Sequence, residues 1–301
     1  ARSADARNRR ESLSRGNQKT MSSSVSAERD SRRLRASADR AIAWIEANRI
    51  PGSGIRPHHK SDVETMEVTG YLIPTLKAVG KLELALDLAR WEASVQAPDG
   101  SFAAPGETVP YTFDTAQVIR GFLSVLDEAP ALEGPLRRAC DWVVQQIQPD
   151  GRVTTPSYDA WKLDDGGTFS DYAHLYVLPP LLQAGSRLGE AAYTRAAQRG
   201  MDYFRNKPDL TEFKPNMGTL SHIFGYMMEA LVELGETALA RKGLAQAAAI
   251  QSSDGAIPAF PGVRWVCSTG IAQLAVAWYK LGDRQPADRA IDYLATLQNA
   301  S

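Results

Sequence analysis

A glutamine followed closely by Asp-Gly recurs along the chain at intervals of about 50 residues, a period typical of repeated helix pairs. Three copies are clear: Gln96 to Phe102, Gln148 to Val153 and Gln251 to Ile257. The first copy follows an amphipathic segment, Lys81 to Val95, in which apolar residues recur at helical spacing. Asp-Gly then ends the helix, because glycine accepts a positive φ and aspartate bonds local backbone donors. The repeat therefore predicts a chain of helical hairpins.

A second, more uniformly apolar helix is predicted after each break. These helices are predicted to begin near Glu64, Phe113, Ser170, Leu220 and Cys267. A helix that is apolar nearly all round is buried on all sides. We therefore expect an all-α domain with the amphipathic helices in an outer ring and the apolar helices in an inner ring. Six outer helices are predicted but only five inner ones, so one inner position stays unassigned.

The chain is predicted to contain one large domain behind a tail. Residues 1–35 are rich in Arg, Ser, Asn and Asp and nearly devoid of large apolar residues, which predicts disorder. Acids are interspersed with the arginines, so a solvated tail is favoured over an arginine-rich arm that binds nucleic acid. Residues 36–301 are predicted to form about six hairpins. The whole chain of 301 residues has 44% hydrophobic residues, which suffices to bury a substantial core.

Charge and composition narrow the classes of partner. The formal net charge of −1 provides no field that would gather nucleic acid. No run of about 18 apolar residues spans a membrane, and no secretory signal is evident, so a cytoplasmic protein is predicted. Cys140 and Cys267 form no C-x-x-C pair, so neither a metal nor another cofactor is predicted. The expected partner is a small molecule or an oligosaccharide.

The repeats resemble the QW-type repeats of the squalene cyclase and protein prenyltransferase superfamily, in the three copies from Gln96 to Phe102, Gln148 to Val153 and Gln251 to Ile257. That resemblance implies an (α/α) toroid over residues 37 to 298. Several enzymes that act on sugars have similar toroid folds, including unsaturated glucuronyl hydrolases, N-acylglucosamine 2-epimerases and polysaccharide lyases. The segments Glu67 to Pro74 and Cys267 to Leu274 look like those of toroid proteins encoded with bacterial surface-polysaccharide enzymes.

Two further likenesses test the isoprenoid branch of the superfamily. Class II terpene cyclases resemble one another in a D-x-D-D-T-A stretch, whose central acid protonates the substrate. Here Tyr111 to Ala116 keeps only the last acid, Asp114, so the expected proton donor is missing. Prenyltransferases hold zinc with Asp, Cys and His, for which Asp114, His222 and Cys267 are the candidates. Cys267 is better interpreted as a small buried residue at a helix start.

Ionisable residues at the starts of inner helices are the candidate catalytic groups, because such positions face the mouth of a toroid cavity. Asp114 either caps its helix or acts as a desolvated acid with a raised pKa. Glu67 is a second carboxylate in a similar place. His174 and His222 begin successive inner helices and would exchange protons near neutral pH. Singly, each histidine is more often structural, but two histidines and two acids in equivalent places favour a polar ligand site.

The candidate substrate-binding residues are mostly aromatic and lie in the same segments: Tyr71, Tyr111, Trp161, Tyr172, Tyr226 and Gln273. Core packing is the alternative role of the aromatic rings. Tyr and Trp combine an apolar face with a polar group, which suits stacking against sugar rings. The long insertion from Thr154 to Phe169 contains Trp161 and is either a lid or an ordinary surface loop.

The leading functional hypothesis is an enzyme that acts on an acidic or uronic-acid-containing saccharide by acid/base catalysis. Hydrolysis would use Asp114 and Glu67, whereas epimerisation or β-elimination would use His174 and His222. The first alternative is a terpenoid cyclase-like or prenyl-transfer enzyme. The second is a scaffold without catalytic activity, which binds a glycan or a protein.

Overall fold

The structure, a computed structural model, describes residues 32–103, 107–156 and 171–299. The chain divides into two compact units, residues 1–47 and 48–301. In the first unit, residues 32–47 form a helix, which begins within the segment predicted as the tail. The disorder predicted for residues 1–31, and most of the insertion that contains Trp161, lie outside the described residues.

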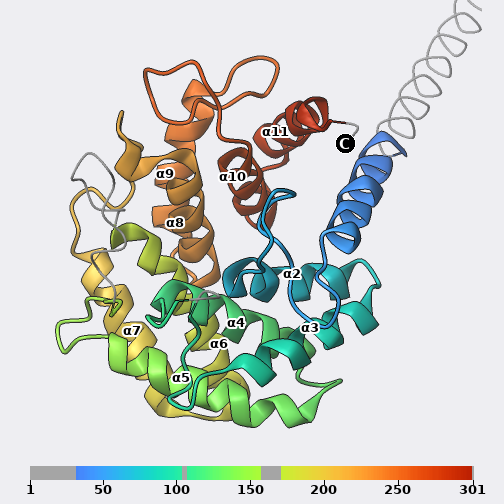
Figure 1. Cartoon of the computed structure of the whole chain (residues 1–301). Helices are drawn as coiled ribbons and strands as arrows, with labels where there is room; N and C mark the ends of the chain where they lie inside the picture. Colours follow the sequence, from blue (N-terminus) through green and yellow to red (C-terminus); the bar gives the residue numbers. More distant parts are fainter. Residues whose placement is uncertain (1–31, 104–106, 157–170, 300–301) are drawn as a thin grey trace, which may run out of the picture. The chain divides into compact units, whose positions relative to one another are not determined.

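The second unit contains an inner and an outer layer of α-helices (Figure 1). The inner helices are α2 (Met66–Ala78), α4 (Thr112–Val125), α6 (Leu178–Leu188) with the preceding 3-10 helix η3 (Asp171–Val177), α8 (Ser221–Glu233) and α10 (Ser268–Lys280). The outer helices are α3 (Leu82–Val95), α5 (Glu133–Gln146), α7 (Ala191–Arg205), α9 (Thr237–Ile250) and α11 (Arg284–Leu297). Two short 3-10 helices are η1 (Pro130–Leu132) and η4 (Met217–Thr219). α2, α4, α8 and α10 start within two residues of their predicted starts, whereas near Ser170 the 3-10 helix η3 begins first and the α-helix α6 starts only at Leu178.

The inner helices pack side by side in chain order: α2 against α4, α4 against η3 and α6, and α8 against η3, α6 and α10. The α2–α4 contact is close because glycine lies at the crossing. A Cβ atom added at Gly70 would lie 2.7 Å from the backbone carbon of Gln117. Such an approach brings polar side chains of neighbouring inner helices within reach of one another.

The Gln…Asp-Gly motif joins neighbouring outer helices. Gln96, after α3, donates its amide to the carbonyl of Pro135 in α5 at 2.9 Å, and accepts from Arg138 at 2.6 Å. Gly100 has φ +96°, and a Cβ there would lie 2.2 Å from the carbonyl oxygen of Arg138. Gln251, after α9, repeats the pattern with the carbonyl of Pro286 in α11 at 3.0 Å. The motif is therefore a helix stop that also docks on the next outer helix.

The two ends of the inner layer differ in their connections. Long loops precede the inner helices, and isolated β-bridges lie in four of them: Arg49 with Ile55, Ala103 with Pro110, Ile147 with Val153, and Pro258 with Val266. We call this side the helix-start end. Short turns follow the inner helices at the other side, which we call the short-turn end, and each of two such turns has a glycine of positive φ, Gly80 and Gly235.

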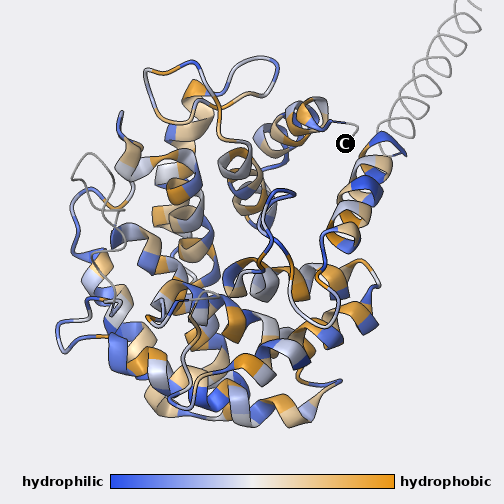
Figure 2. Cartoon of the chain, in the orientation of Figure 1, coloured by the Kyte–Doolittle hydropathy of each residue, from blue (hydrophilic) through white to orange (hydrophobic). Residues whose placement is uncertain are grey.

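Hydrophobic and hydrophilic residues are interspersed along the helices of the second unit (Figure 2). Among the described residues, no helix combines the length and the hydropathy needed to cross a membrane.

Candidate active site

A cavity of about 650 Å³ lies among the inner helices. Its lining comes from α2, α4, η3, α6, α8 and α10, so five segments predicted from separate repeats do meet around one hollow. Tyr71, Tyr226, His222 and Gln273 line it towards the helix-start end. Charged side chains line it towards the short-turn end. The volume is in the range of small-molecule sites, about 300–1,000 Å³.

Glu67 and Asp114, which we call the acid pair, occupy the first turns of α2 and α4. Tyr111 is the N-cap residue of α4, so Asp114 does not hold the capping position. Burial raises the pKa of Asp114 well above its ordinary value, and the negative charges of Glu67 and Glu107 raise it further. Asp114 therefore stays protonated at a pH where ordinary aspartates have lost their proton.

Glu67 is distinguished from Asp114 by two tyrosine donors. Its Oε1 accepts from the hydroxyls of Tyr71 and Tyr226, each at 3.4 Å. Burial raises the pKa of Glu67, while these two hydrogen bonds act to lower it. Two neighbouring carboxyl groups in different environments are the usual arrangement that separates an acid from a base. Asp114 is the better proton donor of the two, and Glu67 the better acceptor.

Tyr71 and Tyr226 line the cavity and reach Glu67 through their hydroxyls, whereas Glu67 and Asp114 are not among the residues that line the described cavity. Burial raises the pKa of Tyr71 and of Tyr226, so both hydroxyls remain donors at any physiological pH. The Tyr226 ring packs against Phe113 and Tyr176, with ring centres 5.0 Å and 4.8 Å away. This packing fixes the Tyr226 hydroxyl in position and leaves part of an aromatic surface on the cavity wall.

His222, also on the cavity wall, contacts Gln273 and Tyr226. Its Nδ1 lies 2.9 Å from the amide oxygen of Gln273, and its ring centre lies 4.5 Å from that of Tyr226. When Nδ1 carries the ring proton, it donates to this amide oxygen and Nε2 is the basic nitrogen. Burial lowers the pKa of His222, and the Gln273 contact opposes that shift. His222 is therefore a neutral base at neutral pH.

The remaining sequence-predicted residues lie elsewhere. His174 is buried in η3, and burial lowers its pKa to about 4 against a small opposing effect of Asp171. Tyr172 donates to Asp209 and packs on Phe204 of α7, so it faces an outer helix. Tyr111 donates to Glu107 at 3.0 Å. Trp161 lies outside the described residues. The structure thus brings together Glu67, Tyr71, Asp114, His222, Tyr226 and Gln273.

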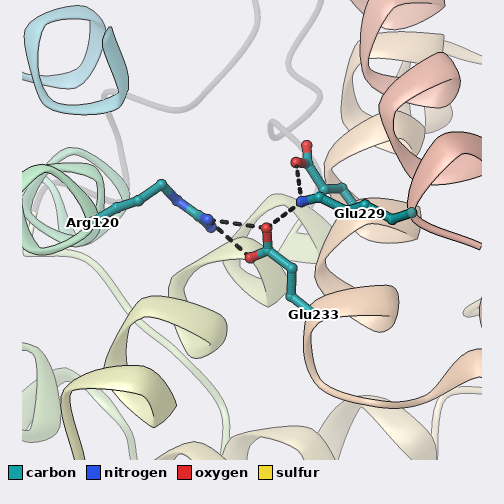
Figure 3. A network of polar contacts seen from close by, with 4 residues as sticks. Arg120, Glu229 and Glu233 are labelled. Carbon is teal, nitrogen blue, oxygen red and sulfur yellow. Dashed lines mark hydrogen bonds and ion pairs between the residues drawn. The ribbon is translucent and has the colours of Figure 1, made fainter. Parts of the chain in front are cut away.

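Sequence reasoning missed four charged residues on the later turns of the inner helices, which we call the ion-pair network: Arg120, Glu229, Glu233 and Lys280. Arg120 Nη1 lies 2.9 Å from one oxygen of Glu233 and 3.1 Å from the other (Figure 3). Lys280 Nζ lies 2.8 Å from Glu229 and 2.5 Å from Glu233. The two glutamates lie four residues apart in an apolar helix, a spacing that places them on one face and was the available signal.

Arg120, Glu233 and Lys280 of the network are ionised at neutral pH. Burial acts to raise the pKa of Glu233, but Arg120 and Lys280 outweigh it and hold that pKa below its ordinary value. Burial likewise acts to lower the pKa of Lys280, but the two glutamates raise it. The Arg120 guanidinium also lies 4.5 Å from the centre of the Tyr176 ring, a cation–π contact. Paired charges with these shifts stay charged across the neutral range.

Comparisons with known proteins show which solved structures have a similar fold. No protein-family description and no curated protein matches the chain. Among solved structures, it is similar to an α-amylase from Clostridium perfringens, at a TM-score of 0.68 and 13% identity, covering 86% of each chain. It is also similar to a type II terpene cyclase from Scytonema, at a TM-score of 0.62 and 16% identity, covering 90% of this chain and 80% of that one.

A polysaccharide lyase is similar at a TM-score of 0.59 and 11% identity, covering 89% of this chain and 83% of that one. Identities this low show the fold alone. The chain has the (α/α) toroid fold, which confirms the predicted fold class.

The zinc prediction of the prenyl-transfer alternative finds no support in this site. No group of three His, Cys, Asp or Glu side chains in the described part of the chain is placed to hold a metal ion. Cys267 is the N-cap residue of α10 and is partly buried.

Proposed function

We propose that this protein is an enzyme that cleaves a glycosidic bond in a saccharide by acid/base catalysis, with the acid pair as its catalytic groups. The observation that carries the proposal is the contrast within the pair. Asp114 has its pKa raised by burial and by two neighbouring negative charges, while Glu67 accepts two tyrosine hydrogen bonds. Two carboxyl groups with such different environments match the acid and the base of a glycosidase.

In this mechanism, the saccharide extends from the cavity past the two tyrosines to the acid pair, and Asp114 donates its proton to the oxygen of the bond that breaks. Glu67 either takes a proton from the attacking water or attacks the sugar carbon itself. Tyr71 and Tyr226 hold the Glu67 carboxylate in place through the hydroxyls that bond it. His222 offers Nε2 as an acceptor for a sugar hydroxyl at the cavity wall. The elimination and epimerisation hypotheses required two histidines together, and only His222 lines the described cavity.

An acidic sugar as part of the substrate remains our proposal from the sequence. The similarity to a polysaccharide lyase supports a saccharide of some kind, although it shows the fold alone. Both cations on the described cavity lining, Arg120 and Lys280, are already paired with glutamates. A uronic acid unit would therefore be bound away from the ion-pair network.

The cyclase alternative has less support. Phe113 stands where the class II cyclases place their central acid, and its ring packs against Tyr226 and Tyr176 rather than providing a proton.

The test is turnover of an oligosaccharide panel that includes uronic-acid-containing fragments, followed by mass spectrometry. Cleavage in oxygen-18 water places the label in the product if the reaction is hydrolysis, and not if it is elimination. Asp114→Asn and Glu67→Gln should each lower kcat by about 10²–10⁴-fold with unchanged helical circular dichroism. Asp87→Asn, in an exposed ion pair on α3, is the matched control and should retain full activity. An absence of cleavage by the native chain, or full activity in both variants, would refute the proposal.

A further inference from the structure

The ion-pair network forms the wall of the cavity towards the short-turn end, away from Tyr71 and His222. All four of its side chains line the cavity, and they come from three inner helices, α4, α8 and α10. The side chains of Arg120, Glu229 and Glu233 are only 11–13% exposed, while Lys280 is 36% exposed. A ligand in the cavity would therefore meet charged groups that have lost most of their water.

The charges of the network cancel within the network. Two cations face two carboxylates, and each carboxylate is bonded by at least one cation. Arg120 Nε and Nη2 have no hydrogen-bond partner among the described residues, but both atoms are buried from solvent. A ligand carboxylate that approached Arg120 or Lys280 from the cavity would meet the negative charge of Glu229 or Glu233 at close range. A neutral hydroxyl has no such cost, because it accepts from an ammonium and donates to a carboxylate without breaking a pair.

We propose that this end of the cavity is a subsite for an uncharged sugar unit, held by its hydroxyl groups. The proposal rests on the proposed function, because it assigns the part of the saccharide that does not react. Tyr176 and Tyr226 add ring surface to the same cavity, and their rings lie 4.8 Å apart. Ring surface beside paired charges matches a sugar, which has apolar C–H faces and polar hydroxyls at its rim.

The proposed subsite should distinguish sugars by their charge. A uronate differs from the corresponding hexose only at C6, where a carboxylate replaces a hydroxymethyl group. The balanced network should favour the hexose. Glu233→Gln removes one negative charge and leaves the network with a net positive charge, so it should reverse the preference. If the network only holds α4, α8 and α10 together, Glu233→Gln should not change the preference between hexose and uronate.

The experiment measures binding without turnover, in the Asp114→Asn background. The probes are matched methyl glycosides, glucose against glucuronate and galactose against galacturonate, observed by saturation-transfer NMR. We expect a neutral glycoside to bind at least about tenfold more tightly than its uronate partner. Glu233→Gln should raise the affinity for the uronate about tenfold and lower that for the hexose. Glu128→Gln, which alters the exposed pair with Lys77, is the control and should change neither.

Lys280→Met provides a second variant in case Glu233→Gln does not fold, since Lys280 is the most exposed member of the network. It leaves a net negative charge and should weaken the uronate further than the hexose. Binding of neither sugar, tighter binding of the uronate to the native network, or an unchanged preference in a folded variant overturns the subsite. Preferred binding of the hexose, together with no cleavage of the oligosaccharide panel by the native chain, would instead uphold the subsite and refute the proposed cleavage.

Discussion

The two ends of the cavity contain similar side chains in opposite electrostatic situations. At the helix-start end, the two carboxyl groups of the acid pair lie together, and their pKa values are raised. At the short-turn end, two carboxylates lie against Arg120 and Lys280, and the pKa of Glu233 is lowered. Burial acts to raise the pKa of carboxyl groups at both ends. The sign of the neighbouring charge therefore decides whether a buried carboxyl group becomes a proton donor or a fixed anion.

The largest expected effect comes from breaking the ion pairs at the short-turn end. Arg120→Met leaves Glu233 without its bidentate partner, so the free energy of unfolding should fall by about 3–5 kcal/mol. Asp114→Asn removes a costly desolvated acid and should leave that free energy unchanged or higher. Urea denaturation of the two variants measures both effects. Arg90→Met, in an exposed pair with Asp87, is the control for the loss of an arginine. A loss of stability of the same size in Asp114→Asn would contradict the contrast between the ends.

His174, which precedes α6 at the helix-start end, should make the protein sensitive to acid. Its pKa is about 4 in the folded chain, against an ordinary value near 6.5. The unfolded chain therefore takes up the proton first as the pH falls, so stability is lost between about pH 6.5 and 4, by about 3 kcal/mol in all. His174→Leu should remove that part of the pH dependence. The measurement is the difference in unfolding free energy between native chain and variant at each pH. His58→Gln, at an exposed histidine, is the control for the loss of an imidazole.

Glu92 offers a third location for the comparison, on outer helix α3. It is fully buried, and neither of its oxygens has a hydrogen-bond partner in the described part of the chain. Burial raises its pKa well above the ordinary value, so its stability penalty grows as the pH rises above about 4.5. Glu92→Met should therefore stabilise the fold at pH 7 by about 1–3 kcal/mol, and by less at pH 4. Thermal unfolding at the two pH values tests this. Glu83→Met, exposed on the same helix, should be nearly neutral.

The smallest expected effect tests whether the negative charge of Glu107 helps to raise the pKa of Asp114. Glu107 contributes a negative charge from an exposed position, so Glu107→Gln should lower that pKa slightly, because solvent screens most of an exposed charge. Carbon-13 NMR of the Asp114 carboxyl group follows the titration without any need for a substrate. The alkaline fall of the pH–activity profile should move to lower pH by the same amount. Glu128→Gln at the short-turn end should leave the Asp114 titration in place, and an equal shift in that control would assign the effect to net charge alone.

The sequence by itself determined the helices and their two layers. The apolar spacing, the helix stops at Asp-Gly and the uniformly apolar second helices act within a few residues of the chain, so they can be interpreted locally. The starts of α4, α8 and α10 were predicted to within one residue for this reason. The same rule placed Glu67 and Asp114 in equivalent first turns, and the fold brought them together.

Only the tertiary structure decided which side chains meet. Arg120 and Glu233 lie 113 positions apart, and their contact depends on how α4 and α8 are rotated against each other, which no local pattern specifies. His174 and His222 looked equivalent in sequence, yet His174 lies in a 3-10 helix with three residues per turn and is buried, whereas His222 lies in an α-helix and lines the cavity. Helix formation is a property of neighbours along the chain. The charge around a carboxyl group is a property of neighbours in space.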